Sequence, residues 1–217
     1  MIPGSGGSTL PTAQLPMTDD PRQSPPSTPP ARLGVVSAGV IYGFLAAAAF
    51  LGAWLFLDRA PLALPDAEPV ALWLKALLGA GVGVAVFALD QVSERFVPLL
   101  RRMSVAMRDL LGHISANQAL ALALFSSVGE ELFFRGFLQA WIGIIPASIA
   151  FGVLHIAPDK RLWPWPILAV AMGFAFGGLF EYTGDVLAPI LAHFTINYFG
   201  LTALSRSAPT PPPTPQD

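Results

Sequence analysis

The chain has 217 residues, of which 53% are hydrophobic and 12% are charged, and its mean hydropathy is +0.59. Soluble domains carry about 25% charged residues, so this composition excludes a water-soluble single domain. A net charge of -2 gives no basic face for a nucleic-acid partner, and the absence of cysteine excludes disulfides, thiolate zinc sites and thiol nucleophiles.

The two ends of the chain are rich in proline. Residues 1–33 and 206–217 hold 13 of the 22 prolines, among Gly, Ser, Thr and Gln. This composition predicts disordered tails at 1–33 and 205–217. Residues 1–30 lack the basic start and the apolar run of a signal peptide, so we expect the membrane segments themselves to direct insertion.

Between the tails, apolar stretches recur at the length that crosses a bilayer, which needs about 20 helical residues. The sequence predicts an all-α, polytopic membrane bundle of about six helices, or seven or eight with short or re-entrant segments. Two peripheral helices are expected within 34–89, a partly amphipathic cytoplasmic loop at 90–114, and a core at 115–204. The six predicted helices cover 34–57, 70–89, 115–143, 144–157, 165–181 and 186–204.

Glycines and basic residues add detail to this bundle. Gly79, Gly81 and Gly83 in the second stretch, and Gly173 with Gly177 in the fifth, would let neighbouring helices approach closely. If the N-terminus is cytoplasmic, nine of the twelve Lys and Arg residues fall on the cytoplasmic side, which predicts that both termini are inside. The indole of Trp163 would then lie at the inner interface.

Three charged residues interrupt the apolar stretch at 115–143. An ionised side chain at mid-bilayer costs about 2.5 to 3.5 kcal/mol, so Glu130, Glu131 and Arg135 must face the bundle interior. Glu131 and Arg135 lie four residues apart on one helix face and can pair directly. That structural ion pair explains two of the three charges, whereas Glu130 projects about 100° away and needs another partner.

His155, His193 and Asn197 are the other polar residues expected at membrane depth. His193 and Asn197 are four residues apart, which puts imidazole and carboxamide on one helix face. Counting 1.5 Å per residue places these groups and Glu130 at overlapping depths. We hypothesise that Glu130 is a general base with His155 as its partner, and that His193 and Asn197 stabilise the oxyanion of a hydrolysed amide.

At these residues the sequence resembles the CPBP family (CAAX protease and bacteriocin-processing, or ABI) of intramembrane glutamic endopeptidases, which includes type II CAAX prenyl endopeptidases. EELFFR at 130–135 fits EExxxR, FGVLH at 151–155 fits FxxxH, and HFTIN at 193–197 fits HxxxN. The resemblance covers 115–204. It implies a water-activating Glu130 supported by Glu131 and Arg135, with His155 as partner and His193 and Asn197 as oxyanion hole.

The resemblance also implies a substrate and a location. We expect a lipidated or transmembrane-anchored protein or peptide as the substrate, with CAAX-type or C-terminal sorting-signal processing as the two options. The expected location is the bacterial cytoplasmic membrane, and the lipid bilayer and the substrate are the expected partners.

Several alternatives remain open at this point. Two histidines and a glutamate could bind zinc, although HExxH is absent and our hypothesis needs no cofactor. Serine and aspartyl mechanisms fit worse, because Ser126 and Ser127 lack a GxSG context and Asp185 lacks a GxGD motif and a second intramembrane aspartate. A non-catalytic membrane adaptor or immunity protein, or a small proton-coupled transporter, is the alternative from a different functional class.

Overall fold

The computed structural model describes residues 34–65 and 67–206. In this part of the chain every regular element is a helix, and one isolated antiparallel bridge joins Ala63 to Asp185. The prediction of an all-helical membrane bundle is confirmed. The predicted tail at 1–33 and residues 207–217 of the tail predicted at 205–217 lie outside the described residues, whereas residues 205 and 206 belong to the last helix.

Four helical segments are long and apolar enough to cross a membrane within the described residues. The other two predicted spans are less regular: one is divided into three elements, and one is a helix of only 11 residues. The elements in chain order are α1 Val35–Leu57, α2 Leu72–Phe96, α3 Pro98–Leu111, α4 Ala116–Glu131, the π-helix η1 Leu132–Gln139, α5 Ala140–Ile142, α6 Ile144–Leu154, the 3-10 turn η2 Lys160–Leu162, α7 Pro164–Thr183 and α8 Leu187–Arg206.

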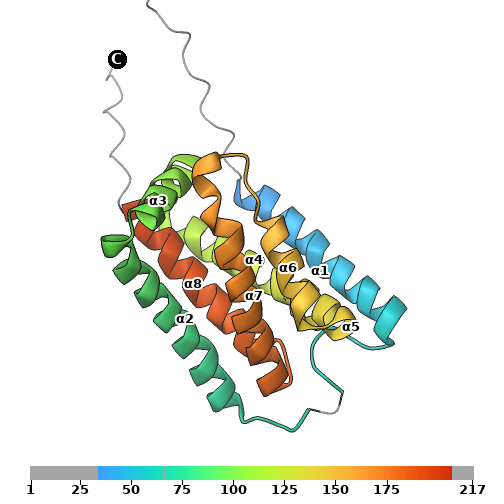
Figure 1. The fold of residues 1–217 in the computed structure, drawn as a ribbon. Coiled ribbons are helices and arrows are strands. Elements are labelled where there is room, and N and C mark those ends of the chain that lie inside the picture. The colour runs from blue at the N-terminus through green and yellow to red at the C-terminus, as the bar shows by residue number, and fades with distance from the viewer. Residues whose placement is uncertain (1–33, 66, 207–217) are drawn as a thin grey trace, which may run out of the picture. The chain divides into compact units, whose positions relative to one another are not determined.

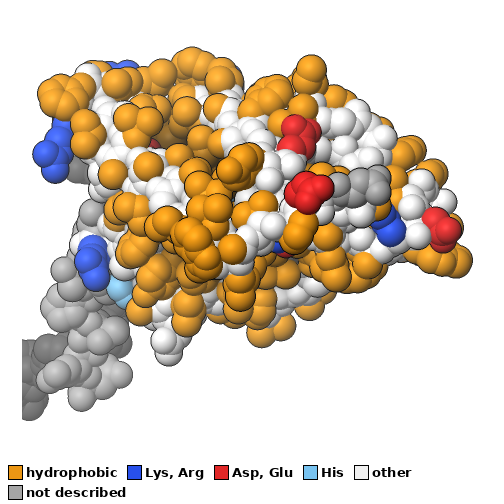
Figure 2. Space-filling view, turned by 90° about the horizontal axis from the view of Figure 1, so that it is seen from below, with side chains coloured by type: hydrophobic (Ala, Val, Ile, Leu, Met, Phe, Trp, Pro, Cys, Tyr) orange, Lys and Arg blue, Asp and Glu red, His pale blue; other side chains and the backbone are white. Residues whose placement is uncertain are grey.

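The outer surface of the bundle is apolar. Large hydrophobic side chains are exposed on several helices, with exposed fractions of 80% for Val36, 78% for Phe44 and 78% for Phe96. In Figure 2 hydrophobic side chains cover most of the face shown. An exposed apolar surface of this extent indicates a lipid environment rather than water. The helices suit that environment because their backbone polar groups are hydrogen-bonded within each helix.

The expectation of a loop at 90–114 is wrong. Helix α2 continues to Phe96, and α3 follows after one residue, beginning at Pro98 and ending before Gly112. Proline suits the first turn of a helix, and Gly112 adopts a positive φ of 65° that ends it. Met103 and Ala106 form the buried face of α3, so the strong amphipathicity of this segment produces a helix rather than a loop.

Two of the three α2 glycines that were expected to allow close helix packing do so. A Cβ atom on Gly79 would lie 2.5 Å from the Ala188 carbonyl oxygen of α8, and one on Gly83 would lie 2.6 Å from Cβ of Thr195. Gly81 faces open space. Helices α2 and α8 therefore meet along a seam of backbone contact, and this seam fixes where α8 lies in the bundle.

The ends of the bundle differ in charge. Helix α3 lies across the end where α2 and α8 finish and α7 begins, as Figure 1 shows. The basic residues at this end are Arg95, Arg101, Arg102, Arg108, Lys160, Arg161 and Arg206. At the other end Arg59 donates to the Ala63 carbonyl and Lys75 pairs with Asp185. This distribution agrees with the predicted cytoplasmic termini, which remain a prediction.

Candidate active site

The charged segment lies where α4 passes into the π-helix. Ser115 begins α4 with a capping box shared with Gln118. Directly after Glu131 the backbone widens into η1, and Gly136 then packs so closely on the Pro61 carbonyl that a Cβ atom would lie 2.0 Å from its oxygen. π-turns within helices are frequent at functional sites.

Glu131 is paired on both sides. Its Oε2 atom lies 3.1 Å from Arg135 Nε, an ion pair without hydrogen-bond alignment, and its Oε1 atom lies 2.7 Å from His193 Nδ1. The exposed fractions are 0% for Glu131 and 1% for Arg135. The Arg135 guanidinium lies 4.6 Å from the ring centre of Phe151, and His193 stacks on Phe176. The expected Glu131–Arg135 pair is present, and His193 extends it to α8.

Glu130 has a looser environment. Its Oε2 atom lies 3.9 Å from His155 Nε2, beyond hydrogen-bond range, and has no hydrogen-bond partner among the residues that the structure describes. The His155 Nδ1 atom lies 2.7 Å from the Phe151 carbonyl oxygen, and the His155 ring meets the Trp165 indole edge to face. The backbone bond orients His155 so that Nε2 faces the carboxylate. Glu130 itself is 8% exposed.

Asn197 is joined to α4 through Ser126. The Asn197 side-chain amide donates to Ser126 Oγ at 2.9 Å, and Ser126 donates to the Ala123 carbonyl. The Ser126–Asn197 and Glu131–His193 contacts together hold α4 and α8 antiparallel. A carboxamide nitrogen carries two N–H groups, so one bond to Ser126 leaves a second donor. The sequence did not predict this contact, because Ser126 stands out there only as a serine without a GxSG context.

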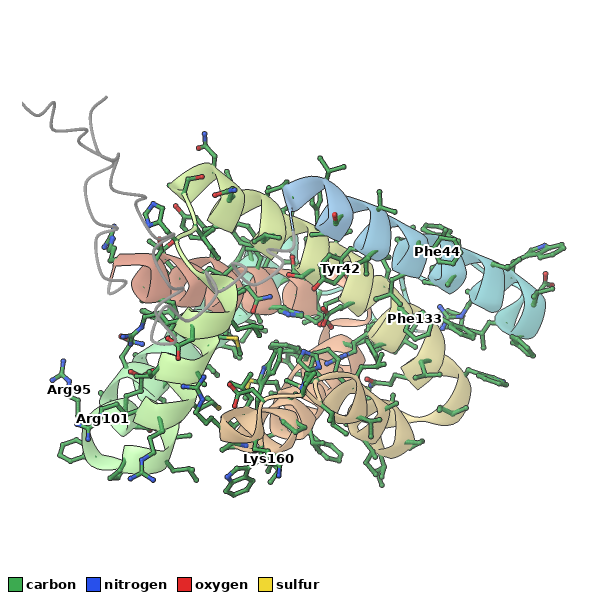
Figure 3. All side chains as sticks on the ribbon, turned by 90° about the horizontal axis from the view of Figure 1, so that it is seen from above. Tyr42, Phe44, Arg95, Arg101, Phe133 and Lys160 are labelled. Carbon is green, nitrogen blue, oxygen red and sulfur yellow. The ribbon has the colours of Figure 1, made fainter. Side chains whose placement is uncertain are left out.

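Tyr42 is a second residue that sequence analysis missed. Its hydroxyl is within hydrogen-bonding reach of the Glu130 carboxylate, and Figure 3 labels it on α1. The backbone fixes this approach, since a Cβ atom on Gly129 would lie 2.7 Å from the Tyr42 carbonyl oxygen. The signal that could have identified Tyr42 is its polarity, because Ser37 is the only other hydroxyl-bearing residue in α1.

The six predicted site residues therefore form three contacts. Glu130 faces His155, Glu131 joins Arg135 and His193, and Asn197 reaches α4 through Ser126. Within residues 34–65 and 67–206, no group of three or more His, Cys, Asp or Glu side chains is placed to hold a metal ion. This arrangement defines a membrane-embedded helical bundle that buries a carboxylate and an imidazole side by side.

Comparison with known proteins shows what part of the chain resembles. Residues 113–199 match the family model described as "Type II CAAX prenyl endopeptidase Rce1-like". The chain is also 30% identical over 120 residues to the uncharacterized protein YpbD of Bacillus subtilis (strain 168); the match covers 55% of this chain and 63% of that relative, less than two thirds of its length. No solved structure matches the chain. The matched residues contain all three motifs, so this part of the chain is similar to the Rce1-like family, as the motif resemblance predicts.

Proposed function

We propose that the chain is an intramembrane endopeptidase in which Glu130 activates a water molecule to hydrolyse a peptide bond. The observation that supports it most directly is the facing pair of Glu130 Oε2 and His155 Nε2, 3.9 Å apart inside an apolar bundle. A buried carboxylate oxygen without a hydrogen-bond partner is costly, so it is more often retained for chemistry than for stability.

The hydrogen bonds of His155 indicate how a water would be held. When Nδ1–H donates to the Phe151 carbonyl, the neutral ring presents Nε2 as an acceptor. Glu130 and His155 are then two acceptors at a separation that one bridging water can span by donating to both. The lone pairs of that water point away from the pair, towards the position of a substrate carbonyl.

In the proposed reaction, Glu130 takes a proton as the water oxygen attacks the peptide carbonyl carbon. The tetrahedral oxyanion collapses, the C–N bond breaks, and the proton passes from Glu130, directly or through His155, to the leaving amine. One water is consumed and a new carboxylate and amine result. Positioned general bases contribute about 100- to 10,000-fold to such rates.

His193 and Asn197 are the proposed donors to the oxyanion. Glu131 Oε1 binds Nδ1 of His193, so Nε2 on the other side of the ring is the nitrogen proposed to face the oxyanion. The second amide N–H of Asn197 is the other donor. Glu131 and Arg135 act through His193 and are positioning residues in this scheme.

The proposed substrate is a membrane-anchored protein or peptide, because the apolar exterior places the bundle among molecules that share the bilayer. CAAX-type processing behind a lipidated residue and removal of a C-terminal sorting segment are the two forms consistent with the family. We propose that the reaction needs no metal. Cleavage should therefore persist after dialysis against a chelator, and loss of activity that zinc restores would contradict this part of the proposal.

The decisive experiment uses purified protein reconstituted in vesicles with lipidated and transmembrane-anchored peptide substrates. Glu130→Gln should lower kcat by roughly 1,000-fold while the protein keeps its thermal stability. Glu68→Gln, which neutralises an exposed carboxylate, is the matched control and should cleave normally. Normal cleavage by Glu130→Gln would exclude Glu130 as the base. Substrate binding without cleavage by the unmodified chain would instead favour the adaptor alternative.

A further inference from the structure

A hollow of about 230 Å³ lies at the basic end of the bundle and shares no lining residue with the candidate active site. It is lined by Arg101, Arg102 and Val105 of α3 and by Arg161 of η2. Three arginines around one small hollow form a concentrated positive surface on a protein whose charged content is only 12%. Guanidinium groups are suited to planar, bidentate contact with phosphate oxygens.

The charges of this hollow are arranged unequally. Arg161 is held by Asp109, at 2.8 Å, and by Asp159, which it contacts through Nε and Nη2. These hydrogen bonds hold the pKa of Asp159 below its ordinary value. By contrast, Arg101 and Arg102 have no ion pair within the described part of the chain, so their charge remains available. Arg161 is thus held in a fixed orientation at the hollow. Arg101 and Arg102 are the lining arginines without an ion-pair partner among the described residues.

The position of the hollow fits the headgroup layer of a bilayer. Helix α2 ends at Phe96 and α7 begins at Pro164, so α3 and η2 lie at the level where membrane spans finish. Figure 3 shows Arg95 and Arg101 reaching outward from this end. Exposed Phe96 and Trp163 are nearby in the chain, and a tryptophan at this level is typical of a membrane interface.

We propose that the hollow lined by Arg101, Arg102 and Arg161 binds the phosphate of an anionic phospholipid from the adjoining leaflet. The apolar exterior of the neighbouring spans would accommodate the acyl chains while the arginines hold the headgroup, an arrangement that a free phosphate ion cannot use. Anionic lipids are attracted to basic segments that adjoin membrane spans. The proposal does not depend on proteolysis, and its failure would leave the proposed function unaffected.

The test compares lipid selectivity in phosphatidylcholine vesicles that contain the full chain. Electron spin resonance with spin-labelled phosphatidylglycerol, and separately with spin-labelled phosphatidylcholine, gives their relative association with the protein. We expect the unmodified chain to prefer phosphatidylglycerol about threefold or more. The double variant Arg101→Gln/Arg102→Gln should lose this preference, and because both side chains are exposed it should fold normally.

The matched control is Arg95→Gln/Arg206→Gln, which removes two charges from the same end but none from the lining of the hollow. It should keep most of the preference. Equal loss in both double variants would show general charge attraction and would overturn the site. No preference in the unmodified chain would also overturn it, as would its abolition by millimolar inorganic phosphate, which would identify an ion site rather than a lipid site.

Discussion

Glu130 and Glu131 are neighbours in sequence, yet they occupy opposite kinds of environment. Glu131 is fully buried, with a guanidinium 3.1 Å from one oxygen and an imidazole 2.7 Å from the other. Glu130 is also buried, but its carboxylate has looser neighbours, the Tyr42 hydroxyl and the imidazole of His155 at 3.9 Å from Oε2. Because consecutive residues project in different directions from a helix, Glu131 lies in an ion-pair cluster while Glu130 lies outside it.

The difference between these carboxylates separates stability from chemistry. Removing one partner of a buried ion pair lowers the stability of the folded protein strongly, because the other charge is left without compensation. A buried acceptor oxygen without a hydrogen-bond partner already destabilises the folded protein. Removing its charge therefore removes this destabilisation. The cluster around Glu131 should therefore dominate stability, and Glu130 should dominate activity.

The largest expected effect on stability is that of Glu131→Gln. Without the carboxylate charge, Arg135 loses its ion-pair partner at 3.1 Å, and we expect a loss of about 3–5 kcal/mol in the free energy of unfolding. Glu130→Gln should change stability by less than about 1 kcal/mol. Unfolding in detergent, followed by tryptophan fluorescence, measures both. A larger loss for Glu130→Gln than for Glu131→Gln would reverse the comparison.

A double-mutant cycle sharpens this prediction. Arg135→Met alone leaves the Glu131 carboxylate with His193 as its one close ionisable partner, whereas Glu131→Gln/Arg135→Met removes both charges of the ion pair. Since two neutral groups replace two buried charges, the double variant should be more stable than the sum of the single losses predicts, by about 1–3 kcal/mol. Strict additivity would mean that the 3.1 Å contact contributes no coupling energy.

Sequence patterns predicted the parts of this molecule that depend on local spacing. The length of the apolar stretches predicted the helices, and the four-residue spacing of Glu131 and Arg135 predicted their ion pair, because both follow from helix geometry. The π-helix and the amphipathic α3 were not predicted: a π-turn depends on packing such as that of Gly136 on Pro61, and the charges of α3 resembled those of a loop. Contacts between distant segments, such as Ser126 with Asn197, need the tertiary structure.

The position of α8 gives a third, smaller expected effect. Gly79→Val would place a Cβ atom 2.5 Å from the Ala188 carbonyl oxygen and push α8, which carries His193, away from α2. We expect a stability loss of about 1–3 kcal/mol, measured by thermal unfolding in detergent. Gly81→Val is the matched control, because Gly81 has no atom within 4 Å of its Cβ position, and it should change little. Equal effects would mean that the α2–α8 seam does not constrain α8.

The smallest expected effect is that of Tyr42→Phe, which removes one hydroxyl within reach of Glu130. Because the ring stays and α1 keeps its backbone contact at Gly129, stability should fall by no more than about 1 kcal/mol. If the hydroxyl orients the Glu130 carboxylate towards His155, kcat should fall up to about tenfold and KM should stay nearly unchanged.

Phe44→Leu is the matched control for Tyr42→Phe, because Phe44 lies exposed on the same helix. It should leave kcat unchanged. Tyr42 lies outside residues 113–199, the region that matches the family model, so a selective fall in kcat would show that the functional site extends beyond that region. An unchanged kcat would confine the chemistry to α4, α6 and α8 and would leave α1 a packing role alone, and a rise in KM without a change in kcat would assign Tyr42 to substrate binding.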